Sequence, residues 1–205
     1  MEFLLLGFIT SLSLILAIGA QNIFVIEQGL KGQYIFIVCL ICSISDGLLI
    51  FLGLFLFHYF NQYFNSTVQL IFNILLIIFL IHFIYSKIRS RNDKINFNSL
   101  IKDVSIKDII FKTLSFTYLN PHVYSDTVFF LGNFSKNFLI AEKVKFGIGA
   151  SLASFMFFFS IGYMAKYLSK YAYNKKTWKY INTFIIIFMS ILVLIILKEI
   201  IFYFE

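Results

Sequence analysis

The chain has 205 residues, of which 60% are hydrophobic and only 13% are charged. Soluble domains are roughly 45–50% apolar and about 25% charged, so this composition excludes an ordinary water-soluble domain. The formal net charge of +7 could indicate nucleic-acid binding. However, the basic residues lie between apolar segments, where membrane orientation explains them better, and we expect no nucleic-acid partner.

Apolar segments long enough to cross a bilayer recur along the chain. A helix needs about 17–25 residues to cross the hydrocarbon region. We therefore predict an all-α membrane protein with six spanning helices, at 3–26, 33–60, 65–86, 112–132, 144–166 and 180–200. The start of the chain lacks the basic region and cleavage site of a secretory signal, so we expect the first helix to be retained.

One hydrophilic segment, residues 87–111, divides the chain into a first half, 1–86, and a second half, 112–205. Each half holds three predicted spans, so the two halves must insert in opposite orientations, as in inverted-repeat transporters. Residue similarity between the halves is weak, and the repeat is inferred from the span count.

Basic residues are divided unequally between the two sides of the predicted membrane. Thirteen of the 17 Lys and Arg residues fall in the loops after spans one, three and five. These residues are Lys31, Lys87, Arg89, Arg91, Lys94, Lys102, Lys107, Lys112, Lys166, Lys170, Lys175, Lys176 and Lys179. The positive-inside rule places the long basic loop 87–112 in the cytoplasm and both termini outside. A re-entrant fourth segment would move the C-terminus to the other face.

Two aspartates lie inside apolar segments. Asp46 is the one charged residue between Lys31 and Lys87, and Asp126 is the one between 113 and 135. A carboxylate at bilayer depth costs about 2.5–3.5 kcal/mol on insertion scales, and such residues are functional by default. The alternative for Asp46 is a structural acid that is bonded to Ser43, Ser45 or backbone amides. We predict that the two acids handle a cation or a proton.

A second polar cluster, Gly19, Gln21 and Asn22, lies late in the first span. An unwound turn at this point would free backbone carbonyls and amides to contact a substrate. The alternative is that Gln21 and Asn22 form hydrogen bonds with a neighbouring helix.

The third cluster contains Asn120, Pro121, His122 and Tyr124, and it ends at Asp126. Pro121 lacks an amide hydrogen and clashes with the preceding turn, so it kinks or breaks the fourth span and leaves carbonyls without helical partners. His122 and Asp126 are four residues apart and therefore share a helical face. Histidine can change its charge near neutral pH, so the pair is either a proton relay or a static bridge that locks the kink.

Cys39 and Cys42 lie three residues apart within the second span. No histidine or second cysteine pair accompanies them, so we expect packing residues and not a metal site. A membrane thiol–disulfide carrier is the alternative, and replacement of both by serine would discriminate the two. The sequence also lacks a nucleophile–base pair and a phosphate-binding glycine loop, so we predict neither an enzyme nor a bound cofactor.

At these motifs the chain resembles the lysine exporter family of bacterial inner-membrane amino-acid exporters, most closely its basic-amino-acid branch. The residues that carry the resemblance are Leu16-Ala17-Ile18-Gly19-Ala20-Gln21-Asn22, Gln28-Gly29, Cys42-Ser43-Ile44-Ser45-Asp46, Leu119-Asn120-Pro121-His122-Val123-Tyr124, Asp126-Thr127 and Ala153-Ser154-Phe155. The resemblance implies multi-pass insertion in the inner membrane and efflux of lysine or arginine, driven by the membrane potential or a proton gradient. The family usually has proline where this chain has Ala20, so Gly19 must supply the flexibility of the first break.

We therefore expect one site at the interface of the two halves. Its predicted residues are Gly19, Gln21, Asn22, Ser45, Asp46, Asn120, Pro121, His122, Tyr124 and Asp126. The two acids would bind the cationic groups of a basic amino acid, and the broken-helix amides with Gln21, Asn22 and Asn120 would bind its α-amino-acid end. Exchange for protons would offset the work of moving a cation outward. Export of a neutral amino acid or of a divalent metal is the alternative, and a homodimer is left open.

Overall fold

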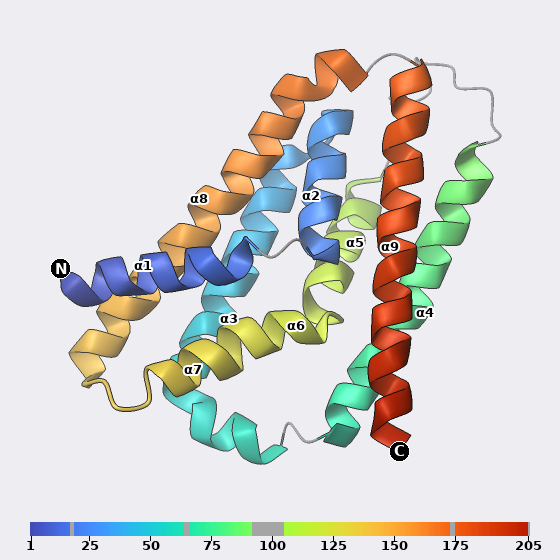
Figure 1. Cartoon of the computed structure of the whole chain (residues 1–205). Coiled ribbons are helices and arrows are strands. Elements are labelled where there is room, and N and C mark those ends of the chain that lie inside the picture. Colours follow the sequence, from blue (N-terminus) through green and yellow to red (C-terminus); the bar gives the residue numbers. More distant parts are fainter. Residues whose placement is uncertain (17–18, 64–65, 92–104, 173–174, 205) are drawn as a thin grey trace.

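The computed structural model describes residues 1–16, 19–63, 66–91, 105–172 and 175–204, and every regular element within these ranges is a helix (Figure 1). In chain order the elements are α1 (Glu2–Ile15), α2 (Ala20–Lys31), α3 (Ile35–Tyr63), α4 (Ser66–Arg91), α5 (Ile106–Tyr118), α6 (Pro121–Tyr124), the π-helix η2 (Ser125–Phe130), α7 (Leu131–Phe134), α8 (Ile140–Ala172) and α9 (Lys175–Phe204). The predicted all-helical class is confirmed.

The first predicted span is divided by a sharp bend. α1 ends at Ile15, α2 begins at Ala20, and the two helix axes differ by 84°. Gly19, the residue before α2, has φ −112° and ψ −178°, an extended conformation that any residue can adopt. The predicted break is therefore present, and its backbone needs neither a proline at position 20 nor a conformation reserved for glycine.

The fourth predicted span is divided at Pro121, as expected. α5 ends at Tyr118, Asn120 has extended backbone, and Pro121 is the first residue of α6, where its missing amide hydrogen costs no helical bond. The sequence did not predict that α6 continues into the π-helix η2, whose first turn carries Asp126. Such π-helical turns are frequent at functional sites.

Three described segments are each long and apolar enough to cross a membrane, Ile35–Phe57, Ile140–Lys170 and Lys179–Lys198. The bent pair of α1 and α2 passes the same criterion when taken together. The described apolar segment of α4 is shorter, Asn73–Tyr85, and the predicted span 112–132 is divided among α5, α6, η2 and α7. The count of six spans stays a prediction.

Several helices extend beyond the predicted bounds. α4 continues to Arg91 and α5 begins at Ile106, so both ends of the predicted loop 87–112 are helical, and residues 92–104 lie outside the described part of the chain. Ser105 caps α5, because its Oγ accepts a hydrogen bond from the amide of Lys107 at 3.3 Å. The prediction ended the third span just before Lys87, although lysine and arginine are good helix formers.

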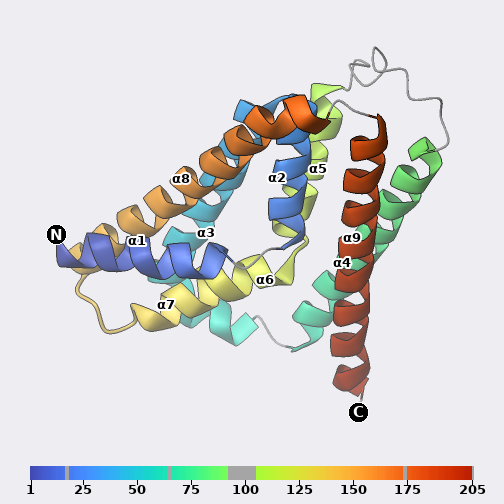
Figure 2. The same ribbon diagram turned by 45° about the horizontal axis from the view of Figure 1, so that its top comes forward.

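Two long helices organise the packing (Figures 1 and 2). α8 runs along α1, α2 and α3, whereas α3 also packs against α5, η2 and α7. α4 packs chiefly against α9, and this pair stands beside the rest of the bundle.

Glycines allow close approach at two helix crossings. Where α1 crosses α8, a Cβ atom at Gly7 would overlap the backbone of Phe146, and one at Gly149 would overlap the backbone of Leu4. Where α3 crosses η2, a Cβ at Gly53 would lie 2.6 Å from the carbonyl oxygen of Val128. Small residues at such crossings let helix backbones pack closely in membranes, where lipid supplies no hydrophobic force between helices.

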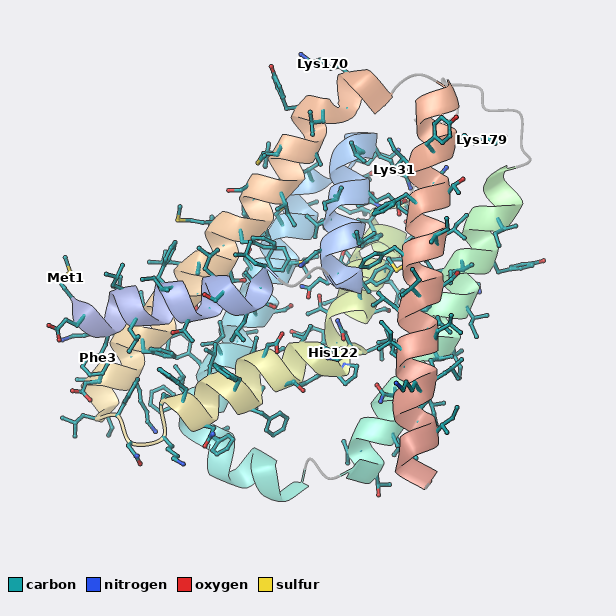
Figure 3. All side chains as sticks on the ribbon, in the orientation of Figure 1. Met1, Phe3, Lys31, His122, Lys170 and Lys179 are labelled. Carbon is teal, nitrogen blue, oxygen red and sulfur yellow. The ribbon has the colours of Figure 1, made fainter. Side chains whose placement is uncertain are left out.

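Several of the basic residues that the structure describes lie toward one end of the bundle. Figure 3 shows Lys31, Lys170 and Lys179 there, at the end of α2, near the end of α8 and near the start of α9. The Arg91 end of α4 and the start of α5 reach the same end, whereas the C-terminus lies at the opposite one (Figures 1 and 2). We call the former the basic end. Other described lysines lie elsewhere, after α7, at the start of α8 and near the end of α9, namely Lys136, Lys143, Lys145 and Lys198.

Replacement of Gly53 by alanine tests the crossing of α3 and η2. We expect a loss of about 1–3 kcal/mol of stability, the usual cost of an overpacked contact. The matched control is Gly47→Ala on the same helix, where the added Cβ would lie at an ordinary 3.5 Å from Ser151 Oγ. Thermal unfolding in detergent should separate the two variants, and equal midpoints would contradict the close crossing.

Candidate functional site

A cavity of about 410 Å³ lies where the two helix breaks meet. A Cβ atom placed on Gly19, at the first break, would lie only 3.9 Å from Asn120 Nδ2, at the second. The predicted site residues that line this cavity are Gly19, Gln21, Asn22, Asp46, Asn120, His122 and Asp126. The structure therefore brings together residues that are up to 107 positions apart in the printed sequence, from Gly19 to Asp126.

A side chain bridges each helix break. Asn22 Nδ2, on α2, donates to the carbonyl oxygen of Ile15 at the end of α1, at 3.1 Å. Tyr124 Oη, on α6, donates to the carbonyl oxygen of Tyr118 at the end of α5, at 3.0 Å. Each bond supplies a partner for a carbonyl that the break removes from its helix. In hydrocarbon such carbonyls would otherwise cost several kcal/mol each, so these bonds help to make the breaks tolerable.

The first turns of two helices start at the cavity. The Oδ1 of Asn120 accepts a hydrogen bond from the amide of His122 at 3.1 Å and thereby caps α6. At the start of α2, where Gly19, Ala20 and Gln21 line the cavity, no side chain of the described residues caps the helix. The first amide groups of a helix lack intrahelical acceptors and carry partial positive charge, so this helix end favours an anionic group.

Asp46 projects from the middle of α3 into the cavity wall and is 5% exposed. Its Oδ2 accepts a hydrogen bond from Ser154 Oγ, on α8, at 2.8 Å. Its Oδ1 is buried and has no hydrogen-bond partner within the described ranges, and the same holds for Nε2 of the neighbouring Gln21. Gln21 and Asp46 interact with each other, and beyond this contact the described protein groups leave the two atoms without a hydrogen bond.

Asp126 faces the same cavity from η2. It is half-buried, and it lies close enough to Asp46 and to His122 for their charges to interact. His122 lines the cavity and is exposed (Figure 3). The structure thus supports the predicted proximity of His122 and Asp126.

Aliphatic side chains from α4 and α9 form the opposite side of the cavity, which we call the aliphatic wall. Its members are Leu76, Leu80, Leu192, Ile195 and Ile196. One side of the cavity is therefore polar and acidic, and the other is apolar.

Three predicted residues do not line the cavity. Ser45 is buried beside Asp46, Pro121 is buried at the start of α6, and Tyr124 bridges the second break. Sequence reasoning missed Ser11 and Thr127 as lining residues. It also assigned no role to the partner of Asp46, Ser154, although that residue lies within one of the motifs that carry the resemblance.

The two cysteines are free and completely buried. Cys39 Sγ contacts the carbonyl oxygen of Phe158 at 3.2 Å, and Cys42 lies near Gln21 and Asp46. No group of three or more His, Cys, Asp or Glu side chains within the described residues could hold a metal ion.

Ser154→Ala tests the hydrogen bond that Ser154 donates to Asp46. The variant removes the hydroxyl donor from a buried carboxyl group, and an unsatisfied buried group costs about 1–3 kcal/mol. Ser151→Ala on the same helix is the matched control, because Ser151 Oγ has no hydrogen-bond partner among the residues described. Thermal unfolding should show a lower midpoint for Ser154→Ala, and indistinguishable midpoints would argue against the bond.

Comparison with known proteins identifies the family. A family model described as LysE type translocator matches residues 12–199. The arginine exporter protein ArgO of Pectobacterium atrosepticum is 30% identical over 181 residues, which cover 87% of this chain and 88% of that protein. The putative amino-acid transporter YggA of Aeromonas salmonicida is 31% identical over 184 residues, which cover 87% of each chain.

A third relative, the arginine exporter protein ArgO of Salmonella enteritidis, is 28% identical over 198 residues, which cover 94% of this chain and 92% of that protein. No solved structure shows a significant match. The family match spans more than half of the chain, including both helix breaks and both buried aspartates, and this chain belongs to the LysE family of translocators.

Proposed function

We propose that this protein exports lysine, arginine or both across the bacterial inner membrane by secondary transport. The observation that carries the proposal is the pair of carboxylates, Asp46 and Asp126, that face one cavity between two broken helices. The membership in the LysE family and the relatives named arginine exporters support an amino-acid substrate.

The cavity matches the chemistry of a basic amino acid. Its carboxylates complement the α-ammonium and the charged end of the side chain, and the aliphatic wall complements the methylene stem between them. The side-chain amide of Gln21 and the uncapped start of α2 complement the α-carboxylate. A neutral amino acid offers one cationic group to two acids, so it fits this charge pattern less well.

We further propose that the two halves form an inverted repeat of three spans each. The packing supports this arrangement, because exchange of the halves maps the most extensive contacts onto one another. The pair α1–α2 would correspond to α5–α7, α3 to α8, and α4 to α9. Under this exchange, the packing of α8 against α1 and α2 corresponds to the packing of α3 against α5, η2 and α7. The contact between α3 and α8 corresponds to itself, and so does the contact between α4 and α9.

The orientation follows from the basic end, which the positive-inside rule places in the cytoplasm together with the loop 87–112. Outward movement of a cation against an inside-negative potential costs about 2.3 kcal/mol per charge per 100 mV. Exchange for protons at Asp46 or Asp126, with His122 as relay, would offset this cost. The exposure of His122 at the cavity supports that route, because a relay must reach water.

The function is tested by efflux from proteoliposomes that are loaded with lysine, arginine or leucine. Asp46→Asn and Asp126→Asn should each slow efflux of the basic substrates roughly tenfold or more, because a charge-assisted contact contributes about 1.5–3 kcal/mol and each 1.4 kcal/mol is a factor of ten. Asp108→Asn is the matched control, because Asp108 is exposed in the first turn of α5, away from the cavity.

Wild-type efflux rates in both cavity variants would remove the two acids from the mechanism. Faster efflux of leucine than of lysine and arginine by the unmodified protein would favour the neutral substrate.

A further inference from the structure

Four phenylalanine rings from three helices form one cluster. The ring centroid of Phe116, on α5, lies 4.8 Å from that of Phe24 on α2. It lies 4.7 Å from Phe79 and 5.1 Å from Phe83, both on α4. Phe24 and Phe116 are 1% and 0% exposed. We call these four residues the phenylalanine cluster.

The cluster lies on the basic side of the cavity. Along α2, Phe24 follows the cavity residue Asn22 in the direction of Lys31, which is at the basic end. Along α4, Phe83 follows the cavity residue Leu80 in the direction of the same end. The rings belong to the same buried core as the lining residues Ala20, Leu76, Leu80 and Ile196.

In two further helices, apolar side chains also lie between the cavity residues and the basic end. α5 runs from the basic end toward the cavity, and Phe116 precedes the cavity residue Asn120 by one helical turn. α9 also runs from the basic end, and the buried Ile185 and Met189 precede the cavity residue Leu192. Four helices that contribute to this core thus place apolar side chains between the cavity and the basic end.

This apolar layer offers no polar path through α5. The buried hydroxyls of Thr113 and Thr117 donate to carbonyl oxygens of their own helix, at 2.7 Å and 2.9 Å. Beyond the layer, toward the basic end, the next ionisable group on α2 is the buried Glu27, which forms an ion pair with Lys31. Polar groups therefore lie on both sides of the layer, and aromatic rings separate them.

We propose that the phenylalanine cluster is the gate between the cavity and the cytoplasm, an inference that rests on the transport function proposed above. In this structure the rings are in contact, so the gate is closed. A dry apolar constriction blocks hydrated and charged solutes, because neither water nor a cation finds a hydrogen-bond partner within it. A basic amino acid enters the cavity from the cytoplasm only when the rings separate.

The packing indicates which elements separate. Phe79 and Phe83 belong to α4, which packs chiefly against α9, whereas Phe24 and Phe116 belong to α2 and α5 within the rest of the bundle. Movement of the α4–α9 pair away from α2 and α5 would part the rings and move Met189 with them. One rigid-body step would thus open the gate.

Cysteine labelling tests the gate without any transported substrate. Ser11, which lines the cavity on α1, is replaced by cysteine in a background in which Cys39 and Cys42 are serine. A membrane-impermeant maleimide is then applied to the cytoplasmic face of inverted membrane vesicles. Phe116→Ala should increase the labelling rate of Ser11→Cys several-fold, because truncation of the central ring opens the layer.

Phe79→Ala, at a less deeply buried position, is a second gate variant in case Phe116→Ala does not fold. Phe155→Ala is the matched control, because Phe155 is 42% exposed on α8 and stacks on Phe159, outside both the cavity and the cluster. The gate proposal would be overturned if a folded gate variant left the labelling rate of Ser11→Cys unchanged. It would also be overturned if Phe155→Ala increased that rate equally. The labelling measurement requires no efflux. It therefore tests the gate even if the protein does not export lysine or arginine.

Discussion

The structure depends on two helix breaks that face each other inside a bundle of apolar helices. Lipid offers no hydrogen bonds, so irregular backbone at bilayer depth is tolerated only where protein groups or a water-filled cavity satisfy it. Asn22 and Tyr124 each bridge a break by donating to a carbonyl at the end of the preceding helix. Residues at both breaks then line one cavity, and both aspartates reach it.

The same arrangement explains how acids persist in so apolar a chain. Asp46 receives a hydrogen bond from Ser154, and the side-chain amide of Gln21 lies beside it. Asp126 lies in a π-helical turn that packs against Gly53 of α3, the helix that also carries Asp46. The close crossing of α3 and η2 therefore helps to set the spacing of the two carboxylates. A cation that neutralises both would recover part of the cost of their burial.

Much of this site could be predicted from the sequence, because charge and proline are rare in apolar segments. Asp46, Asp126 and Pro121 each violate the local pattern, and each has a role in the cavity or its break. Other features carry no such signal. Ser154 lies 108 residues from Asp46, and the π-helix packs against Gly53 of another helix. Among the 28 phenylalanines of the chain, no local pattern distinguishes the four that meet between the cavity and the basic end.

The most direct test of the account is an experimental structure of the protein in lipid with bound arginine. We predict that the ligand occupies the cavity between the helix breaks, with its cationic groups in contact with Asp46 and Asp126. Arginine bound elsewhere would contradict the account, and so would carboxylates that contact protein donors alone.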